Sequence, residues 1–199
     1  MKIFKIFLML ATAVTLLSSA ASVKKTYTMS KDYVVTINGT SNLHNWKEKV
    51  EIVTGSGVVN WNSDGSFDLE TTSIKLNVHS IKSDMGAIMN NNTYKALKAD
   101  ANPEIIFSLT VPILSNPANS NKRSIAAKGN LTIAGVTRLV TMPVKLTMQS
   151  HEKLTLEGSQ TIRMTDYKVT PPVALMGTMR TGDEITINFK INLQQAYNL

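Results

Sequence analysis

The sequence predicts an all-β protein, a single antiparallel barrel of eight strands with a short helical segment between strands three and four. Apolar and polar side chains alternate along most of the chain, as in Ile185, Ile187 and Phe189 with polar residues between them. Such strands have one apolar and one polar face. Only one segment has helical spacing, so few helices can cover the sheet. Eight antiparallel strands leave two unpaired edges unless the sheet closes into a barrel.

The strands are expected in order along one domain. We place them at 33–42, 47–61, 66–79, 104–114, 125–133, 140–148, 154–164 and 185–193. Asp64-Gly65, between the second and third strands, is a strong hairpin signal. In the third strand the apolar residues change from odd to even positions, which indicates a bulge between Thr71 and Ser73.

The alternation stops between residues 83 and 102. Apolar residues there recur at three- and four-residue spacings, which is typical of a helix: Met85, Ile88, Met89, Tyr94 and Leu97. Asp84 and Asn92 are candidate helix caps. Asn102-Pro103 should end the segment, because a residue before proline is biased away from helical geometry.

Residues 1–21 have the pattern of a signal peptide. Lys2 and Lys5 give a positive start, an apolar run follows at 6–17, and small residues precede cleavage after Ala20 or Ala21. The chain has no cysteine, which excludes a lipid-anchored lipoprotein and any disulfide. We therefore expect a periplasmic or secreted protein whose single domain spans 22–199.

Charge and motifs exclude several functions. The net charge is +7, but the lysines are scattered, so no nucleic-acid partner is predicted; weak contact with an anionic membrane surface remains open. Without a thiol or a Gly-x-Ser-x-Gly motif, the protein is not expected to be an enzyme. The three histidines, His44, His79 and His151, lack metal-ligand spacing, so neither a metal nor another cofactor is predicted.

The interior of the barrel is the expected functional element. An eight-stranded barrel is either filled by side chains or wide enough for one small ligand. Its inward residues are mostly apolar, which suits a lipid. Two functions remain open, a carrier of an amphiphilic lipid and a structural or interaction barrel with a filled core that acts through its outer surface. Self-association into a homodimer through strand edges also remains open.

Several segments resemble the YceI-like domain family. They are GTSNLHNW at 39–46, TYKALKADANPEIIF at 93–107, GNLTIAGVT at 129–137, MTDY at 164–167, the prolines at 171–172 and GDEI at 182–185. The resemblance covers essentially the whole chain after the signal peptide, in the right order. It implies an extended, lipocalin-like barrel whose tunnel binds amphiphilic lipids of the polyisoprenoid or isoprenoid quinone class.

Twelve residues are candidates for contact with such a ligand. The candidates for its tail are Met85, Met89, Tyr94, Leu97, Ile105, Phe107, Met142 and Met164, because methionine and other flexible apolar side chains adapt to irregular shapes. The candidates for its head group are His44, Trp46, Asp166 and Tyr167, which carry polar atoms near a barrel end. The alternatives are packing of the barrel end, packing of a helix on the barrel, and a turn capped by Asp166.

Overall fold

Eight strands close into an antiparallel barrel in the computed structural model, which describes residues 22–114, 122–174 and 177–197. The predicted signal peptide lies outside the described residues. The elements are β1 Val23–Ser41, β2 Asn45–Val50, β3 Val53–Trp61, β4 Phe67–Asn77, η1 Val78–Ser80, β5 Ile81–Ser83, α1 Ala87–Leu97, β6 Glu104–Leu109, β7 Lys122–Ile133, β8 Val136–Ser150, β9 Lys153–Arg163, η2 Met164–Tyr167, β10 Val173–Ala174 and β11 Met179–Gln195.

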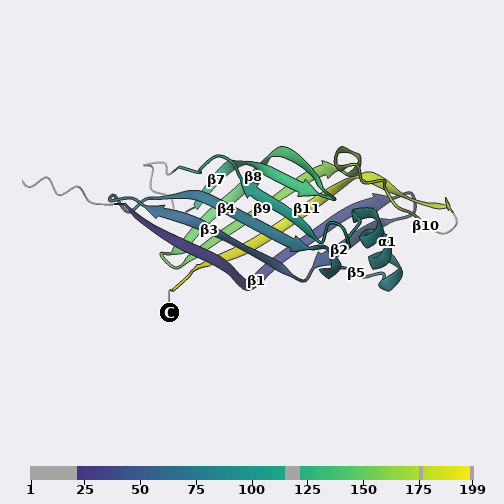
Figure 1. Cartoon of the computed structure of the whole chain (residues 1–199), viewed down its shortest axis with the longest axis horizontal. Helices are drawn as coiled ribbons and strands as arrows, with labels where there is room; N and C mark the ends of the chain where they lie inside the picture. Colours follow the sequence, from purple (N-terminus) through teal and green to yellow (C-terminus); the bar gives the residue numbers. More distant parts are fainter. Residues whose placement is uncertain (1–21, 115–121, 175–176, 198–199) are drawn as a thin grey trace, which may run out of the picture.

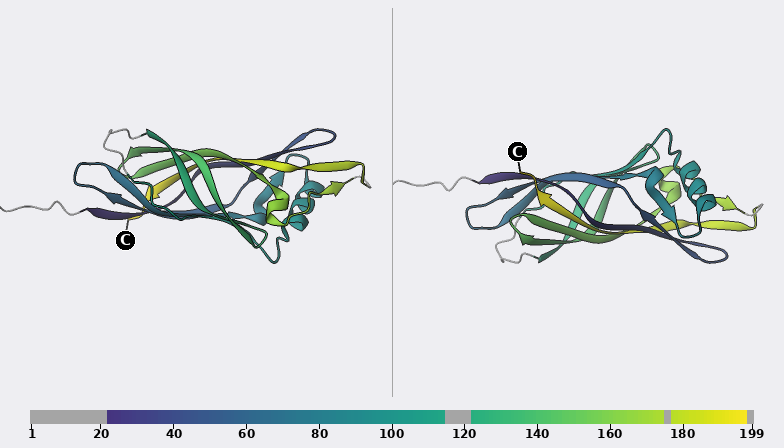
Figure 2. Two further views of the ribbon diagram at one scale, coloured as in Figure 1. Left: turned by 90° about the horizontal axis from the view of Figure 1, so that it is seen from above. Right: turned by 90° about the horizontal axis from the view of Figure 1, so that it is seen from below.

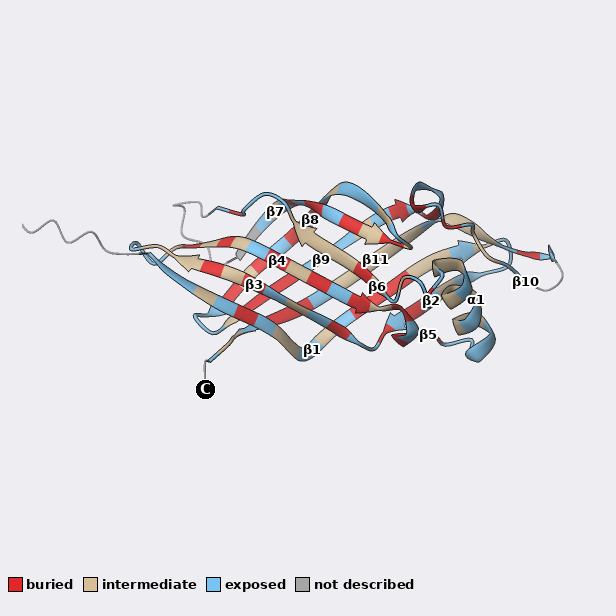
Figure 3. Cartoon of the chain, viewed as in Figure 1, coloured by how far each residue is buried: buried red, intermediate tan, exposed pale blue. Residues whose placement is uncertain are grey.

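The barrel runs in the order β1, β3, β4, β6, β7, β8, β9 and β11, and β11 pairs with β1 to close it. β2 and β5 extend the sheet beyond the second half of β1, and β10 pairs with the start of β11. The result is an elongated barrel with α1 beside one end (Figures 1 and 2). Buried and exposed residues alternate along the strands (Figure 3), so the predicted barrel is confirmed.

The predicted second strand is observed as two, β2 and β3, separated by Glu51 and Ile52. The long strand β1 pairs with β3 through its first part and with β2 through its last part. The Tyr33 hydroxyl lies at the break, where it donates to the Glu51 carbonyl at 2.7 Å and accepts from the Val53 amide at 3.2 Å. In this numbering the predicted helix, α1, lies between β4 and β6.

The turn between β7 and β8 and the bulge in β4 lie close to where the sequence predicts them. Residues Ala134 and Gly135, with φ of 48° and 78°, join β7 to β8, as a tight two-residue hairpin requires. The bulge predicted in the third strand is present in β4. Its unpaired residue is Glu70, because in the pairing with β3 Val58 lies opposite Thr71 and Val59 lies opposite Leu69.

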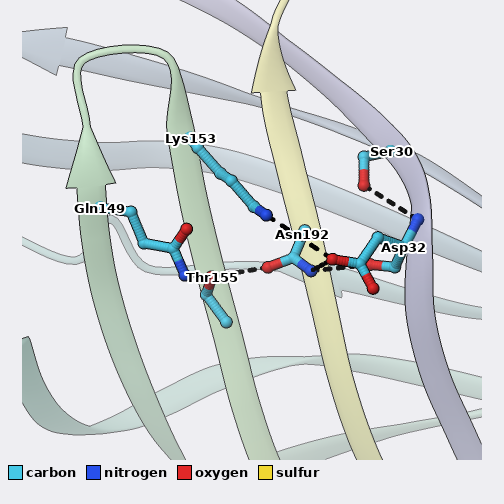
Figure 4. Close-up of polar contacts among 6 residues, drawn as sticks. All are labelled: Ser30, Asp32, Gln149, Lys153, Thr155 and Asn192. Atoms are coloured by element: carbon cyan, nitrogen blue, oxygen red, sulfur yellow. Dashed lines mark hydrogen bonds and ion pairs between the residues drawn. The ribbon is translucent and has the colours of Figure 1, made fainter.

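The closing pair of strands is held by a polar cluster that is buried at Asn192 and Thr155 and reaches the surface at Asp32 (Figure 4). The register of β1 against β11 shifts between Met29 and Tyr33. Asn192 reaches this bulge and donates to the carbonyl and carboxylate oxygens of Asp32 at 2.7 and 3.0 Å. Its own side-chain oxygen accepts from the Thr155 hydroxyl at 2.6 Å, and both Asn192 and Thr155 are buried. The backbone carbonyl of Asp32 at the bulge is therefore bonded by Asn192, and its amide donates to the Ser30 hydroxyl.

The ladder between β8 and β9 covers only part of their length. It runs from Val144–Gly158 to Ser150–Lys153, although β8 begins at Val136 and β9 continues to Arg163. The Pro143 carbonyl faces Gly158, 2.6 Å from where a Cβ would stand. The N–H and C=O of a strand residue point to the same side, so an amide at position 143 would also point toward β9. Proline has no N–H, and the hydrogen-bonded pairing of β8 with β9 cannot continue through it. The two strands separate toward the α1 end of the barrel.

Candidate functional site

One end of the barrel is closed by a packed cluster. Trp61 lies 5.6 Å from Phe67 and 4.2 Å from His151 between ring centroids, and its indole N–H donates to the Tyr27 hydroxyl. The Tyr27 hydroxyl in turn donates to the His151 carbonyl. Beneath this cluster lie side chains with no solvent exposure: Val59, Leu69, Leu146, Leu154 and Leu193. No ligand can lie at this end without displacing a packed core.

An apolar cavity begins beside this closed end. Its volume is about 90 Å³. Almost all its wall is apolar, and it includes Val35, Leu69, Ala127, Met142, Leu156 and Ile191. A space of this size is larger than an ordinary packing defect. We call it the inner section.

A second cavity of about 70 Å³, the outer section, continues toward α1. Ile105 and Ile187 line both sections, so the two adjoin. On β11 the lining residues run from Thr181 to Ile191. Ten residue steps at about 3.3 Å and a strand tilt of about 40° mean that the two cavities, together called the tunnel, span about 25 Å. Over this length the barrel interior therefore contains two adjoining spaces that side chains do not fill.

Two phenylalanines narrow the inner section, and each packs on a glycine. The Phe107 ring lies where a side chain at Gly129 would be, and the Phe189 ring lies 2.7 Å from the place of a Gly158 Cβ. Without these glycines the rings would be displaced into the cavity. Each glycine is therefore required by the close approach of a ring, and each leaves space in the tunnel.

Helix α1 forms one wall of the outer section. Its side chains Met89, Thr93, Ala96 and Leu97 line the cavity, and no residue of the helix is fully buried. The helix is held from its other side, where the Tyr94 hydroxyl lies 2.8 and 2.9 Å from the carbonyl oxygens of His79 and Ile81. Lys82 also donates to this hydroxyl at 2.8 Å. The apolar face of α1 thus borders the cavity, and its Ala96 and Leu97 side chains also pack against the core of the barrel.

The outer section contains one acidic group, Glu48, which is 4% exposed. Its Oε1 accepts from the Thr93 hydroxyl at 2.6 Å. Burial raises the pKa of the Glu48 carboxyl, and the Thr93 hydrogen bond acts in the opposite direction. Tyr167, 2% exposed, lines the same section, and burial is likewise the main reason that its pKa is raised. This end of the tunnel therefore combines apolar walls with a few hydrogen-bonding groups.

Eight of the twelve candidate residues line the tunnel. The inner section includes Phe107 and Met142, Ile105 stands at the junction, and the outer section includes Trp46, Met89, Leu97, Met164 and Tyr167. The Trp46 indole N–H donates to the Thr40 carbonyl at 3.0 Å, and its ring packs over Gly39. The structure thus brings candidates from five separate segments of the chain to one cavity.

The other four candidates lie elsewhere. Tyr94 faces η1 and β5, on the side of α1 away from the cavity. His44 and Met85 face a surface groove outside the barrel, with the imidazole Nε2 3.2 Å from the thioether sulfur. Asp166 is exposed, and its backbone carbonyl accepts from the Arg138 side chain at 3.0 Å. The helix caps also differ from expectation, since Gly86 precedes α1 and Asn92 lies within it, facing the tunnel.

Sequence reasoning missed Glu48 and Thr93. The signal for Glu48 was available, because Trp46, Glu48 and Val50 alternate on β2 and share one face. Glu48 lies between two residues, Trp46 and Val50, whose side chains are expected to face the barrel interior, so its side chain should have been predicted to face the interior as well. Thr93 had no such signal, since its role depends on where α1 sits.

Other types of site are not found in the described residues. Within these ranges no three His, Asp or Glu side chains gather closely enough to hold a metal ion. Among the helices of the described chain, none has the length and apolar character needed to cross a membrane.

Fold and site together define a closed β-barrel with an apolar tunnel that is blocked at one end. The chain belongs to the YceI-like domain family, whose sequence model matches residues 18–193. A comparison with proteins of curated function gave no match.

Several solved structures have a similar fold. A polyisoprenoid binding domain from Saccharophagus degradans, implicated in plant cell wall breakdown, has a TM-score of 0.66 and 9% identity over 86% of this chain and 99% of that chain. BcnA from Burkholderia cenocepacia has a TM-score of 0.57 and 20% identity, with 80% and 95% covered. A Campylobacter jejuni YceI protein has a TM-score of 0.55 and 16% identity, with 76% and 85% covered. At these identities the similarity establishes the fold.

Proposed function

We propose that this protein is an exported carrier or binding protein for one long amphiphilic lipid of the polyisoprenoid or isoprenoid quinone class. The observation that carries the proposal is the tunnel, which is apolar, about 25 Å long from the tilt and rise of its strands, and closed at one end. The sequence pattern of residues 1–21 supports export. The polyisoprenoid binding domain with the similar fold supports the ligand class.

The shape of the tunnel favours a thin, flexible chain. Each buried CH2 group contributes about 0.8 kcal/mol, so a five-carbon isoprene unit contributes about 4 kcal/mol before the costs of association. The tunnel is narrow when empty, and its methionines and phenylalanines must shift to admit a chain. Methionine side chains adapt readily to such changes. In this proposal the lipid tail lies in the inner section and its head group lies at the α1 end.

The proposal is tested by purifying the protein without detergent, extracting it with organic solvent and analysing the extract by mass spectrometry. We expect an isoprenoid lipid in about stoichiometric amount, and saturable uptake of a fluorescent isoprenoid by delipidated protein. A lipid-free extract together with no uptake would refute the carrier function. Fractionation of the source cells, with detection of a chain lacking residues 1–21, tests export separately.

A further inference from the structure

A buried carboxyl group beside an apolar tunnel requires an explanation. Fully buried glutamates are rare unless they are paired, because removing a charge from water is costly. Glu48 has one hydrogen bond, from the Thr93 hydroxyl to Oε1. Among the described residues no hydrogen-bond donor contacts its Oε2 atom, and no lysine, arginine or histidine lines either section of the tunnel. A barrel that needed only an oily interior would have an apolar residue here.

We propose that Glu48 receives the head group of the bound lipid and selects an uncharged hydroxyl, as in a polyprenol or an isoprenoid phenol, over a phosphate. This inference rests on the proposed lipid-binding function. The Thr93 hydrogen bond fixes the carboxyl from the helix side and leaves the second oxygen for the ligand. Asn92 and Tyr167 line the same section and supply further hydrogen-bonding atoms.

A hydroxyl suits this carboxyl in either protonation state. It donates to the carboxylate, or it accepts from the protonated acid, so the hydrogen bond survives a change in charge. Burial raises the pKa of the Glu48 carboxyl, which favours the neutral form. A phosphate would instead bring a negative charge into a section without cationic side chains among its described lining residues. That charge would be unpaired beside the neutral carboxyl, and it would be repelled by the ionised one more strongly than in water.

The test compares the binding of a polyprenol with that of its monophosphate of equal chain length, by displacement of a fluorescent isoprenoid from the delipidated protein. We expect the wild type to bind the polyprenol at least about tenfold more tightly, and Glu48→Gln to reduce this ratio by about tenfold, as expected for removal of a nearby like charge. Glu51→Gln, the same change at an exposed position three residues away, should leave the ratio unchanged.

The outcomes separate this inference from the proposed function. Binding of neither lipid would refute the carrier function and the head-group site together. Equal or tighter binding of the monophosphate by the wild type would refute only the selection of an uncharged head group. Selection that persists in Glu48→Gln would remove Glu48 from the head-group site.

An orientation measurement avoids any dependence on the folding of Glu48→Gln. The chain has two tryptophans, Trp46 in the outer section and Trp61 at the closed end. In the Trp61→Phe variant all tryptophan fluorescence comes from Trp46. A polyprenol brominated in its hydroxyl-bearing unit should quench this fluorescence more strongly than one brominated in its last unit. Stronger quenching by the label in the last unit would place the head group at the wrong end and overturn the proposal.

Discussion

Ala127→Phe should block the inner section and shorten the chain that the protein can hold. Ala127 is 4% exposed on β7, where it pairs with Met142 and lines the inner section. A phenyl ring at this position has no space except the cavity. The neighbouring Ala126 points outward and is exposed, so Ala126→Phe is a matched control with the same added ring on the opposite face of the strand.

The size of the effect follows from the length of tunnel that is lost. On β11 the inner section extends from Ile187 to Ile191, four residue steps, or about 10 Å along the axis after correction for strand tilt. This length holds about two isoprene units, whose burial is worth about 8 kcal/mol gross. If a third of that value is realised as net affinity, Ala127→Phe weakens binding of a long isoprenoid about a hundredfold.

The assay is a series of isoprenols of increasing length, each competed against a fluorescent isoprenoid. In the wild type, affinity should rise with each unit until the tunnel is full; in Ala127→Phe the rise should stop about two units earlier. Overpacking costs about 1–3 kcal/mol of stability, so thermal unfolding must first show that the variant is folded. A folded variant with the wild-type length profile would refute the reasoning.

Three further predictions concern the supports of the tunnel. Asn192→Leu removes the bonds to Asp32 and Thr155, so the free energy of unfolding in urea should fall by about 2–4 kcal/mol; no loss would contradict the role of this cluster. Burial raises the pKa of the Glu48 carboxyl in the folded protein. The contribution of this carboxyl to the free energy of unfolding is therefore complete at pH values below the pKa of a glutamate in the unfolded chain, and it is lost as the pH rises through the folded-state pKa. The melting temperature of Glu48→Gln, measured relative to that of the wild type, should therefore increase from acid to neutral pH. A difference between the two melting temperatures that does not change with pH would contradict this. Tyr94→Phe should accelerate amide exchange in α1 about fivefold, for about 1 kcal/mol lost, without change in the barrel strands; uniform acceleration would contradict local anchoring.

The barrel was predictable because alternation specifies which face of each strand is buried. That pattern is local: buried residues recur at every second position in much of β8, and Ile185, Ile187 and Phe189 of β11 line the tunnel. The first strand was predicted about ten residues too short. The bulge between Met29 and Tyr33 interrupts the alternation with polar residues, and one of them, Asp32, is bonded by Asn192, far away in sequence.

The site was less predictable, because it depends on how α1 lies against the barrel. Helical spacing grouped Met85, Met89, Tyr94 and Leu97 on one face, but only Met89 and Leu97 line the tunnel. Met85 precedes the helix, and Tyr94 is turned toward β5 by its hydrogen bonds. Spacing alone cannot distinguish a side chain over a cavity from one that anchors the helix, since both are partly apolar and partly exposed.

The two ends of the barrel differ in what a passing ligand would have to displace. At the closed end, several side chains including Leu154 and Leu193 have no exposure, and each contributes about 1.5–3 kcal/mol by burial; opening five of them costs on the order of 10 kcal/mol. At the other end no residue of α1 is fully buried, and the ladder between β8 and β9 has already ended at Val144–Gly158. Lifting α1 there exposes no fully buried side chain of the helix itself, and a lipid in the tunnel would contact the side chains that α1 leaves. In the proposed function, a ligand therefore enters and leaves at the α1 end, where the proposed head-group site at Glu48 lies.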